Sequence, residues 1–106
     1  MAYVVFVTTK DADEAKKIAQ KLVEEKLIAC ANIIKGIESL FWWEGKVCQE
    51  NEALMIIKTD KKLFKRVVSR VKSLHSYSVP EVIALPVIEG NKDYLKWITE
   101  STKRKD

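Results

Sequence analysis

The stretch that decides the fold is residues 40–47, Leu-Phe-Trp-Trp-Glu-Gly-Lys-Val. Three large aromatic side chains stand directly before Glu44-Gly45, a pair that favours a tight turn. Long strand-like runs flank this turn on both sides, over 28–43 and 46–58. The stretch is therefore interpreted as the tip of a long β-hairpin. Large aromatic side chains at such a tip need a surface to pack against, which indicates a second copy of the chain or a ligand.

The segments before the hairpin predict one strand and one helix. Residues 3–9 are apolar on both faces until the end of the run, which is typical of a central strand. Apolar side chains at helical spacing predict an amphipathic helix over residues 12–26. Gly36 interrupts the first hairpin strand, and a lone glycine inside a strand indicates a bulge or a bend.

The segments after the hairpin predict a second helix, a fourth strand and a last helix. Asp60 can cap a helix whose apolar stripe runs from Leu63 to Leu74. Residues 79–89 are predicted to form an edge or interrupted strand, because Pro80 and Pro86 cannot donate to a ladder. Asn91 can cap a short last helix.

This order predicts a single α+β domain over residues 1–106. We expect a ferredoxin-like βαββαβ sandwich with a long hairpin between the second and third strands and a C-terminal helix. Two helices would cover one face of the sheet and leave the other open. Strands of about a dozen residues span roughly 40 Å, whereas a chain of this length has a diameter of roughly 34 Å. The hairpin should therefore overhang the domain and contact another subunit. The alternative is a bent hairpin in a monomer.

Composition narrows the class of protein. The 106 residues are 47% hydrophobic and 32% charged, with a net charge of +4. Acids and bases are interspersed, so no nucleic-acid surface is expected. No apolar run reaches the roughly 18 residues of a membrane-spanning helix, and no signal peptide is expected at the N-terminus.

The two cysteines, Cys30 and Cys48, are not expected to form a disulfide. In a hairpin that turns at Glu44-Gly45, the numbers of two paired residues sum to about 89, so Cys30 and Cys48 would not face each other. Reduced thiols and the absence of a signal favour a cytoplasmic protein.

Two side chains are candidate metal ligands. His75, the only histidine, follows the second predicted helix and can bind a metal together with Cys30, Glu81 or a neighbouring subunit. Its alternative role is to close the helix C-terminus through hydrogen bonds. Cys30 can supply a thiolate to a soft metal such as Cu(I), or serve as a buried structural thiol.

No catalytic arrangement is evident, so we expect no enzymatic activity. Neither a paired nucleophile nor a glycine-rich phosphate loop is present. The glutamates of the hairpin are interpreted as a solvated face or as ion-pair partners of Lys46; they are Glu38, Glu44, Glu50 and Glu52. An RNA-recognition domain shares this strand order, but the third strand is acidic and lacks stacking aromatic residues.

Several motifs together resemble the CutA divalent-cation tolerance family. They are Ile28-Ala29-Cys30-Ala31-Asn32, Gly36-Ile37-Glu38-Ser39, Trp42-Trp43-Glu44-Gly45-Lys46, Leu54-Met55-Ile56-Ile57-Lys58-Thr59, His75-x-Tyr77-x-x-Pro80-Glu81-Val82-Ile83 and Tyr94-Leu95-x-Trp97-Ile98. The resemblance covers nearly the whole chain. It implies a cytoplasmic homotrimer, with contacts between subunits expected at Phe41, Trp43 and Trp97. It also implies a role in tolerance of copper and other divalent cations, with no cofactor required.

The resemblance also implies where a ligand would bind. The trimer of this family is similar to that of the PII signalling proteins, which bind small effectors between subunits. By that analogy, the candidate cleft lies near Trp42, Tyr77 and Glu81, with Cys30 and His75 beside it. Copper-binding members carry a cysteine and two adjacent histidines where this chain has Thr8, Leu74 and His75, so one of the three ligands is kept.

Two functions therefore follow from the sequence. The first is a non-enzymatic homotrimer that binds divalent cations, copper foremost. The second is a signalling or scaffold trimer that binds a small effector or a protein in the cleft between subunits.

Overall fold

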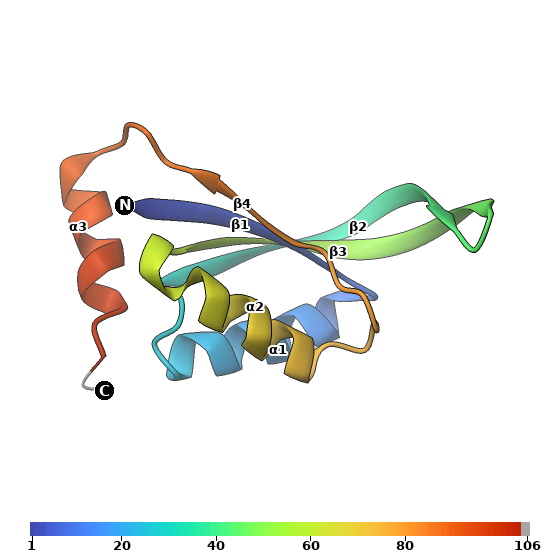
Figure 1. The fold of residues 1–106 in the computed structure, drawn as a ribbon, viewed down its shortest axis with the longest axis horizontal. Helices are drawn as coiled ribbons and strands as arrows, with labels where there is room; N and C mark the ends of the chain where they lie inside the picture. Colours follow the sequence, from blue (N-terminus) through green and yellow to red (C-terminus); the bar gives the residue numbers. More distant parts are fainter. Residues whose placement is uncertain (105–106) are drawn as a thin grey trace.

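The computed structural model describes residues 1–104, which form four strands and three α-helices in the predicted order (Figure 1). The elements are β1 (Ala2–Thr9), α1 (Ala12–Glu24), β2 (Cys30–Trp43), β3 (Lys46–Asp60), a 3-10 turn (Lys61–Leu63), α2 (Phe64–Leu74), β4 (Val82–Pro86) and α3 (Lys92–Ser101). The strands form one antiparallel sheet in the order β2-β3-β1-β4. This arrangement confirms the predicted α+β fold with its long hairpin and C-terminal helix.

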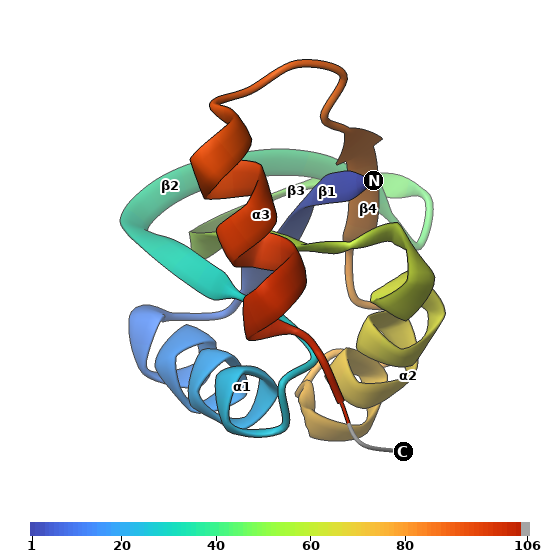
Figure 2. The ribbon, with the colours of Figure 1, turned by 90° about the vertical axis from the view of Figure 1, so that its left-hand side faces the viewer.

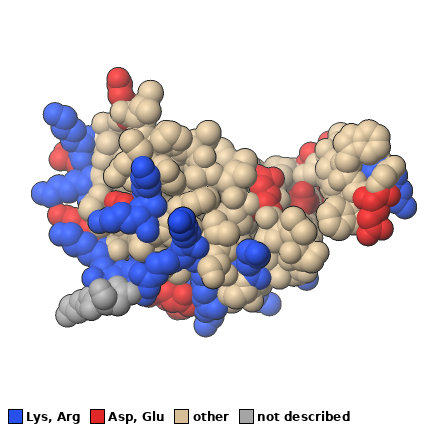
Figure 3. All heavy atoms as spheres, viewed as in Figure 1, with Lys and Arg blue, Asp and Glu red and all other residues tan. Residues whose placement is uncertain are grey.

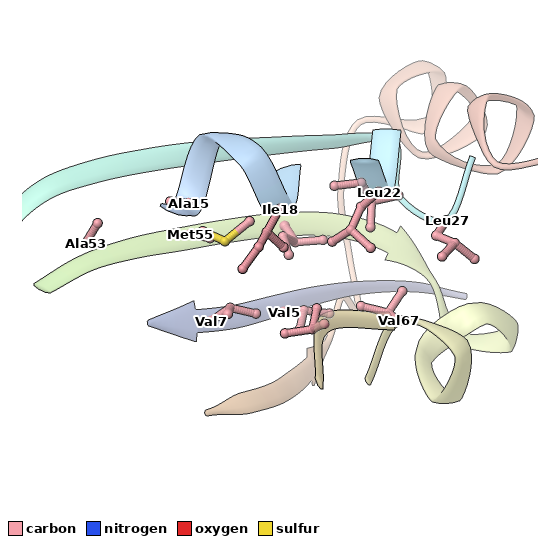
Figure 4. Packing of buried hydrophobic residues seen from close by; sticks show 12 residues of the cluster. Val5, Val7, Ala15, Ile18, Leu22, Leu27, Ala53, Met55 and Val67 are labelled. Carbon is pink, nitrogen blue, oxygen red and sulfur yellow. The ribbon is translucent and has the colours of Figure 1, made fainter. Parts of the chain in front are cut away.

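Both α1 and α2 cover the same face of the sheet, while α3 crosses one end of it (Figures 1 and 2). The core lies between the sheet and the first two helices (Figure 4). Val5 and Val7 of the central strand are fully buried there, as is Met55 of β3. Leu22 of α1 and Val67 of α2 meet them from the helix side and are also fully buried. Alternation along the strands therefore directs every second side chain into this core.

The two side chains predicted to cap helices, Asp60 and Asn91, do accept N-terminal hydrogen bonds, and Asp11 caps α1 as well. Asp11 precedes α1, and its carboxylate accepts a hydrogen bond of 2.8 Å from the Glu14 backbone N–H. Asn91 accepts one of 2.9 Å from the Asp93 N–H at the start of α3. Asp60 accepts a hydrogen bond from the Lys62 N–H, but it opens the 3-10 turn that leads into α2. Each cap satisfies a donor that the first turn leaves unpaired.

The hairpin of β2 and β3 has the predicted register. Trp43 pairs with Lys46, so the numbers of paired residues sum to 89 near the tip. A bulge between Ile34 and Ile37 shifts the register by one, and Gly36 adopts a φ of +67° there. This left-handed conformation favours glycine. The hairpin extends well beyond the helices, and the molecule measures 44 Å along its longest axis (Figure 1).

The cysteines lie apart, as the register predicts. Cys30 pairs with Lys58 and Cys48 pairs with Phe41, and both thiols are free.

The fourth strand is shorter than the predicted range 79–89. β4 spans only Val82–Pro86, so Pro80 lies before it and Pro86 ends it. The preceding segment is held instead by hydrogen bonds to the Thr8 carbonyl, Glu14 and Glu52, as described below. β4 pairs with β1 alone and is an edge strand, as predicted. Within the described range, no helix combines the length and apolar character needed to cross a membrane.

Candidate functional site

His75 fastens the end of α2 to the end of β1. Its Nε2 lies 2.7 Å from the Thr8 carbonyl oxygen, while its Nδ1 lies 3.0 Å from the Tyr77 backbone nitrogen. A carbonyl can only accept and a backbone N–H can only donate, so these contacts require a neutral ring protonated on Nε2. The backbone N–H of His75 also closes α2 by donating to the Val71 carbonyl. Both ring nitrogens are therefore engaged within the chain.

Tyr77 connects this segment to the base of the hairpin. Its hydroxyl donates a hydrogen bond of 2.6 Å to Oε2 of Glu52, in β3. The Glu52 side chain is only 8% exposed, so the interpretation of this residue as part of a solvated face is wrong. Burial raises the pKa of Tyr77, and the hydrogen bond to Glu52 raises it further. The phenol therefore stays protonated and serves as a donor to the buried carboxylate.

Two further carboxylates, Glu81 and Glu14, are related to this contact. Glu81 precedes β4, and its pKa is raised by burial first and then by the negative charge of Glu52. Glu14 of α1 accepts hydrogen bonds from the backbone N–H groups of Ser76 at 2.8 Å and Lys10 at 3.2 Å. Burial alone would raise the pKa of Glu14, but these hydrogen bonds outweigh it and the pKa lies below its usual value. Glu52 therefore connects the two groups, since it binds Tyr77 and its charge acts on Glu81, while Glu14 holds the segment that follows α2.

Cys30 lies at the opposite end of the sheet from this group. Its Sγ is 3.6 Å from the hydroxyl of Tyr94 in α3, and the residue is half-buried. Cys30 pairs with Lys58, which pairs with Val4, whereas His75 contacts Thr8. The two contact points are separated by four residues along the strand direction and by the two strand spacings from β2 across β3 to β1. The two candidate ligands are therefore about 16 Å apart. Within one chain, the structure does not bring Cys30 and His75 together.

Trp42 is also remote from Tyr77 and Glu81 within one chain. Trp42 pairs with Val47 near the hairpin tip. Val47 lies five residues along β3 from Glu52, so Trp42 is about 17 Å from the Tyr77–Glu52 contact along the strand direction. The Trp42 side chain is 74% exposed, against 48% for Trp43. Trp97 of α3 is exposed as well and stacks on Tyr94 with the ring centres 5.4 Å apart. The predicted cleft residues can therefore meet only if another copy of the chain supplies some of them.

The face of the sheet opposite α1 and α2 is apolar and largely uncovered. The register places side chains of β1, β3 and β4 on this open face; the apolar ones are Val4, Phe6, Leu54, Ile56, Ile83 and Leu85. Ile83 and Leu85 are each 56% exposed. Beyond the bulge, Phe41 and Trp43 continue this face onto the hairpin. Contiguous apolar surface of this kind marks an interaction site.

The carboxylates do not form a complete metal site by themselves. Over residues 1–104, no three His, Cys, Asp or Glu side chains are close enough to hold one ion. Glu52 and Glu81 offer oxygen donors, which suit hard divalent cations. Copper could reach His75 only by displacing its hydrogen bond to Tyr77 or to Thr8. An open groove of about 760 Å³ lies beside α1 and is lined by exposed side chains of both signs, including Lys10, Asp13 and Lys17. Glu52 and Glu81, called the acid pair below, do not line this groove.

Sequence comparison decides the family. The profile described as "CutA1 divalent ion tolerance protein" matches residues 3–101. The chain belongs to the CutA1 family. A CutA from Thermus thermophilus is 45% identical over 96% of this chain and 99% of its own length. A chloroplastic CutA from Oryza sativa is 49% identical over 94% of this chain but only 56% of its own length.

Solved CutA structures have the same fold. The Thermus thermophilus protein superposes with a TM-score of 0.95 at 45% identity, covering 97% of this chain and all of that one. The CutA from Archaeoglobus fulgidus gives a TM-score of 0.94 at 42% identity, with 97% and 100% covered. These relatives are named for divalent-cation tolerance and not for a reaction.

The structure brings some of the predicted site residues together and leaves the others apart. His75 and Tyr77 lie side by side, with ring centres 4.7 Å apart, and Glu52 relates Tyr77 to Glu81. The helix-closing role considered for His75 agrees with its hydrogen bonds. The sequence-based prediction of the site missed Glu52 and Glu14. The position of Glu52, immediately before the fully apolar run of β3, was a signal that the residue lies at the margin of the core. The role of Glu14 depends on a contact across 62 residues, and no local pattern indicates it.

Proposed function

We propose that this CutA protein is a homotrimer that binds divalent cations, copper foremost, and has no catalytic activity. The observation that carries the proposal is the match along nearly the whole chain to a family named for divalent-cation tolerance. A protein that binds a divalent cation lowers its free concentration, which is one direct route to cation tolerance. The names of the relatives describe no reaction. The geometry adds two supporting features, one for assembly and one for the cation.

Assembly is supported by the uncovered apolar surfaces. Ile83 and Leu85 lie on the open face, while Trp42 and Trp43 lie on a hairpin that overhangs the body. Burial of such surface is the main driving force of stable association. Residues of the predicted cleft that lie far apart in one chain would come together only across subunits.

Cation binding is supported by the acid pair at the base of the hairpin. Glu52 is buried, and its charge raises the pKa of Glu81. A divalent cation between them would relieve this repulsion, since an opposite charge favours the ionised carboxyl. One chain supplies too few donors, so a second subunit would complete the site. For copper, His75 would have to exchange one of its hydrogen bonds for the metal.

A cytoplasmic location is part of the proposal. It is supported by the two free thiols, which suit a reducing compartment. Relatives named as chloroplastic or periplasmic show that the family occupies other compartments as well, and fractionation of the source cells with an antibody to this chain tests the cytoplasmic assignment.

Isothermal titration of the purified protein with Cu(II), Cu(I) and Mg²⁺ tests the metal role. We expect saturable binding that weakens at least tenfold in Glu81→Gln, and for copper also in His75→Ala. Glu89→Gln removes an exposed acid outside the acid pair and should bind like the unmodified protein. Absence of saturable binding would refute the metal role. Saturable binding that neither variant changes would place the ion elsewhere and refute the assigned residues.

A further inference from the structure

The excess of basic over acidic residues in this protein lies in one segment. Residues 61–80 contain six lysines and arginines and no acid, whereas the other 86 residues carry 13 bases against 15 acids. The whole net charge of +4 therefore originates in the turn and helix that follow β3. The interspersion of charges seen over the full sequence does not hold for α2.

The structure places these bases together on the outer face of α2. Val67 and Val71 are fully buried against the sheet, so they define the inner face. The outer face consists of the exposed residues Lys61, Lys62, Lys65, Arg66, Ser69, Lys72 and Ser73. We call this set the α2 basic face. Figure 3 shows Lys and Arg gathered over the part of the body where α2 and α3 lie, while Asp and Glu stand out along the hairpin.

Among residues 1–104, none of the exposed lysines of the α2 basic face forms an ion pair. Arg70, at the margin of the face, does pair with Glu25 of α1 at 2.8 Å. Asp60 caps the turn, but its side chain is buried and accepts from the Lys62 N–H.

The arrangement costs the isolated fold stability. Cations near a helix N-terminus oppose the helix dipole, and like charges four residues apart repel each other. Lys61 with Lys65 and Lys62 with Arg66 have this spacing at the start of α2. By contrast, α1 and α3 carry acids in their first turns. A destabilising charge pattern that is confined to one exposed face is typical of a binding surface, where function is obtained at the expense of stability.

We propose that the α2 basic face binds the phosphodiester backbone of a nucleic acid without reading its sequence. Lysine, arginine and serine are the side chains that contact phosphates. Lys61 and Lys72 are about 17 Å apart along the helix axis, which matches about five phosphates of one strand at ~3.4 Å each. The four exposed lysines of the face, which form no ion pair within residues 1–104, can each contact one of these phosphates. This departs from the sequence-based expectation of no nucleic-acid partner, which considered the whole chain and the sheet face.

Two other anionic partners fit the face less well. A membrane-surface helix inserts apolar side chains, but the apolar side of α2 is occupied by the core. The core of a protein interface is depleted in lysine and rich in aromatic anchors, which this face lacks. The face also lies on the helix side of the sheet, away from the open face (Figure 2). It would remain accessible in the proposed trimer, and three copies would add avidity.

Fluorescence anisotropy with a labelled 20-base-pair duplex of mixed sequence tests the proposal, using the chain of residues 1–106 between 50 and 200 mM NaCl. We expect binding with a slope of log K against log salt of about −3.6, since the four lysines contribute ~0.9 each. Lys62→Gln with Lys65→Gln should reduce the magnitude of this slope by about 1.8. The control Lys16→Gln with Lys17→Gln removes the same charge from exposed positions of α1 and should leave the slope unchanged.

Three results would overturn the proposal: no binding at 50 mM NaCl, an equal loss in both double variants, or binding to phosphatidylserine vesicles but not to the duplex. Thermal unfolding checks that the variants fold, and the α2 variant should be slightly more stable than the unmodified protein. Light scattering on the same samples reports the oligomeric state separately, so failure here is distinguishable from failure of the proposed trimer.

Discussion

Replacing Trp42 by alanine should weaken assembly more than any other single truncation on the hairpin. A tryptophan side chain can bury about 250 Å², and Trp42 leaves 74% of its surface exposed in one chain. About 185 Å² therefore remains for a partner, worth up to about 4.6 kcal/mol at ~25 cal/mol per Å². Retaining the alanine methyl group lowers the expected loss to about 4 kcal/mol, or roughly a thousandfold in the dissociation constant.

Sedimentation of Trp42→Ala over a wide dilution range measures this loss. Val23→Ala is a matched control, because Val23 is a 44% exposed apolar residue on α1, remote from the open face and the hairpin. The control should dissociate at the same concentration as the unmodified protein. A change of less than tenfold for Trp42→Ala would show that this side chain stays in water in the assembled protein and would refute its role as a subunit contact.

Three further predictions concern the base of the hairpin. Tyr77→Phe leaves Glu52 buried without its donor, so it should lower the free energy of unfolding by about 1.5–3 kcal/mol in urea titrations; an unchanged value would mean that water replaces the phenol. The pKa of Glu81 is higher in the folded than in the unfolded chain. Stability therefore falls as the pH rises from the pKa of Glu81 in the unfolded chain to its pKa in the folded chain. The stability gained by Glu81→Gln in metal-free buffer should therefore be absent near pH 4 and present at pH 7, and a gain independent of pH would contradict this assignment. Gly36→Ala should cost about 1–2 kcal/mol because φ is +67°, with Gly36→Asn costing less; equal stability of all three proteins would show that the bulge relaxes.

The hairpin could be predicted because its determinants are local. The turn residues Glu44 and Gly45 both adopt positive φ, at 49° and 79°, and fix the register from which every pairing follows. Gly36 marked the bulge for the same reason, since its left-handed conformation strains most other residues. The caps at Asp11 and Asn91 likewise involve only residues within the next three positions.

The segment between α2 and β4 was predicted less well because its contacts are remote in sequence. Its conformation depends on Thr8, Glu14 and Glu52, which lie 25 to 67 residues away from their partners. These hydrogen bonds hold Ser76 and Tyr77 outside the sheet, so β4 begins at Val82 and not at residue 79. Apolar content alone does not distinguish such a wrapped segment from a strand.

The candidate site could be predicted only in part for a related reason. His75, Tyr77 and Glu81 stand close together in sequence, whereas Glu52 enters through the register of a distant strand. The net charge of the whole chain also gave no sign of the α2 basic face, because 13 of the 19 bases lie elsewhere in the sequence, interspersed with the acids. A window the length of one helix reveals it.

The oligomeric state tests the account most directly, since the proposed cleft and the shared cation site both require more than one subunit. Size-exclusion chromatography with multi-angle light scattering at micromolar concentration should give a mass close to three times the 12.2 kDa of one chain. A mass of 12.2 kDa would mean that the open face and the aromatic hairpin remain in water, and would contradict the account.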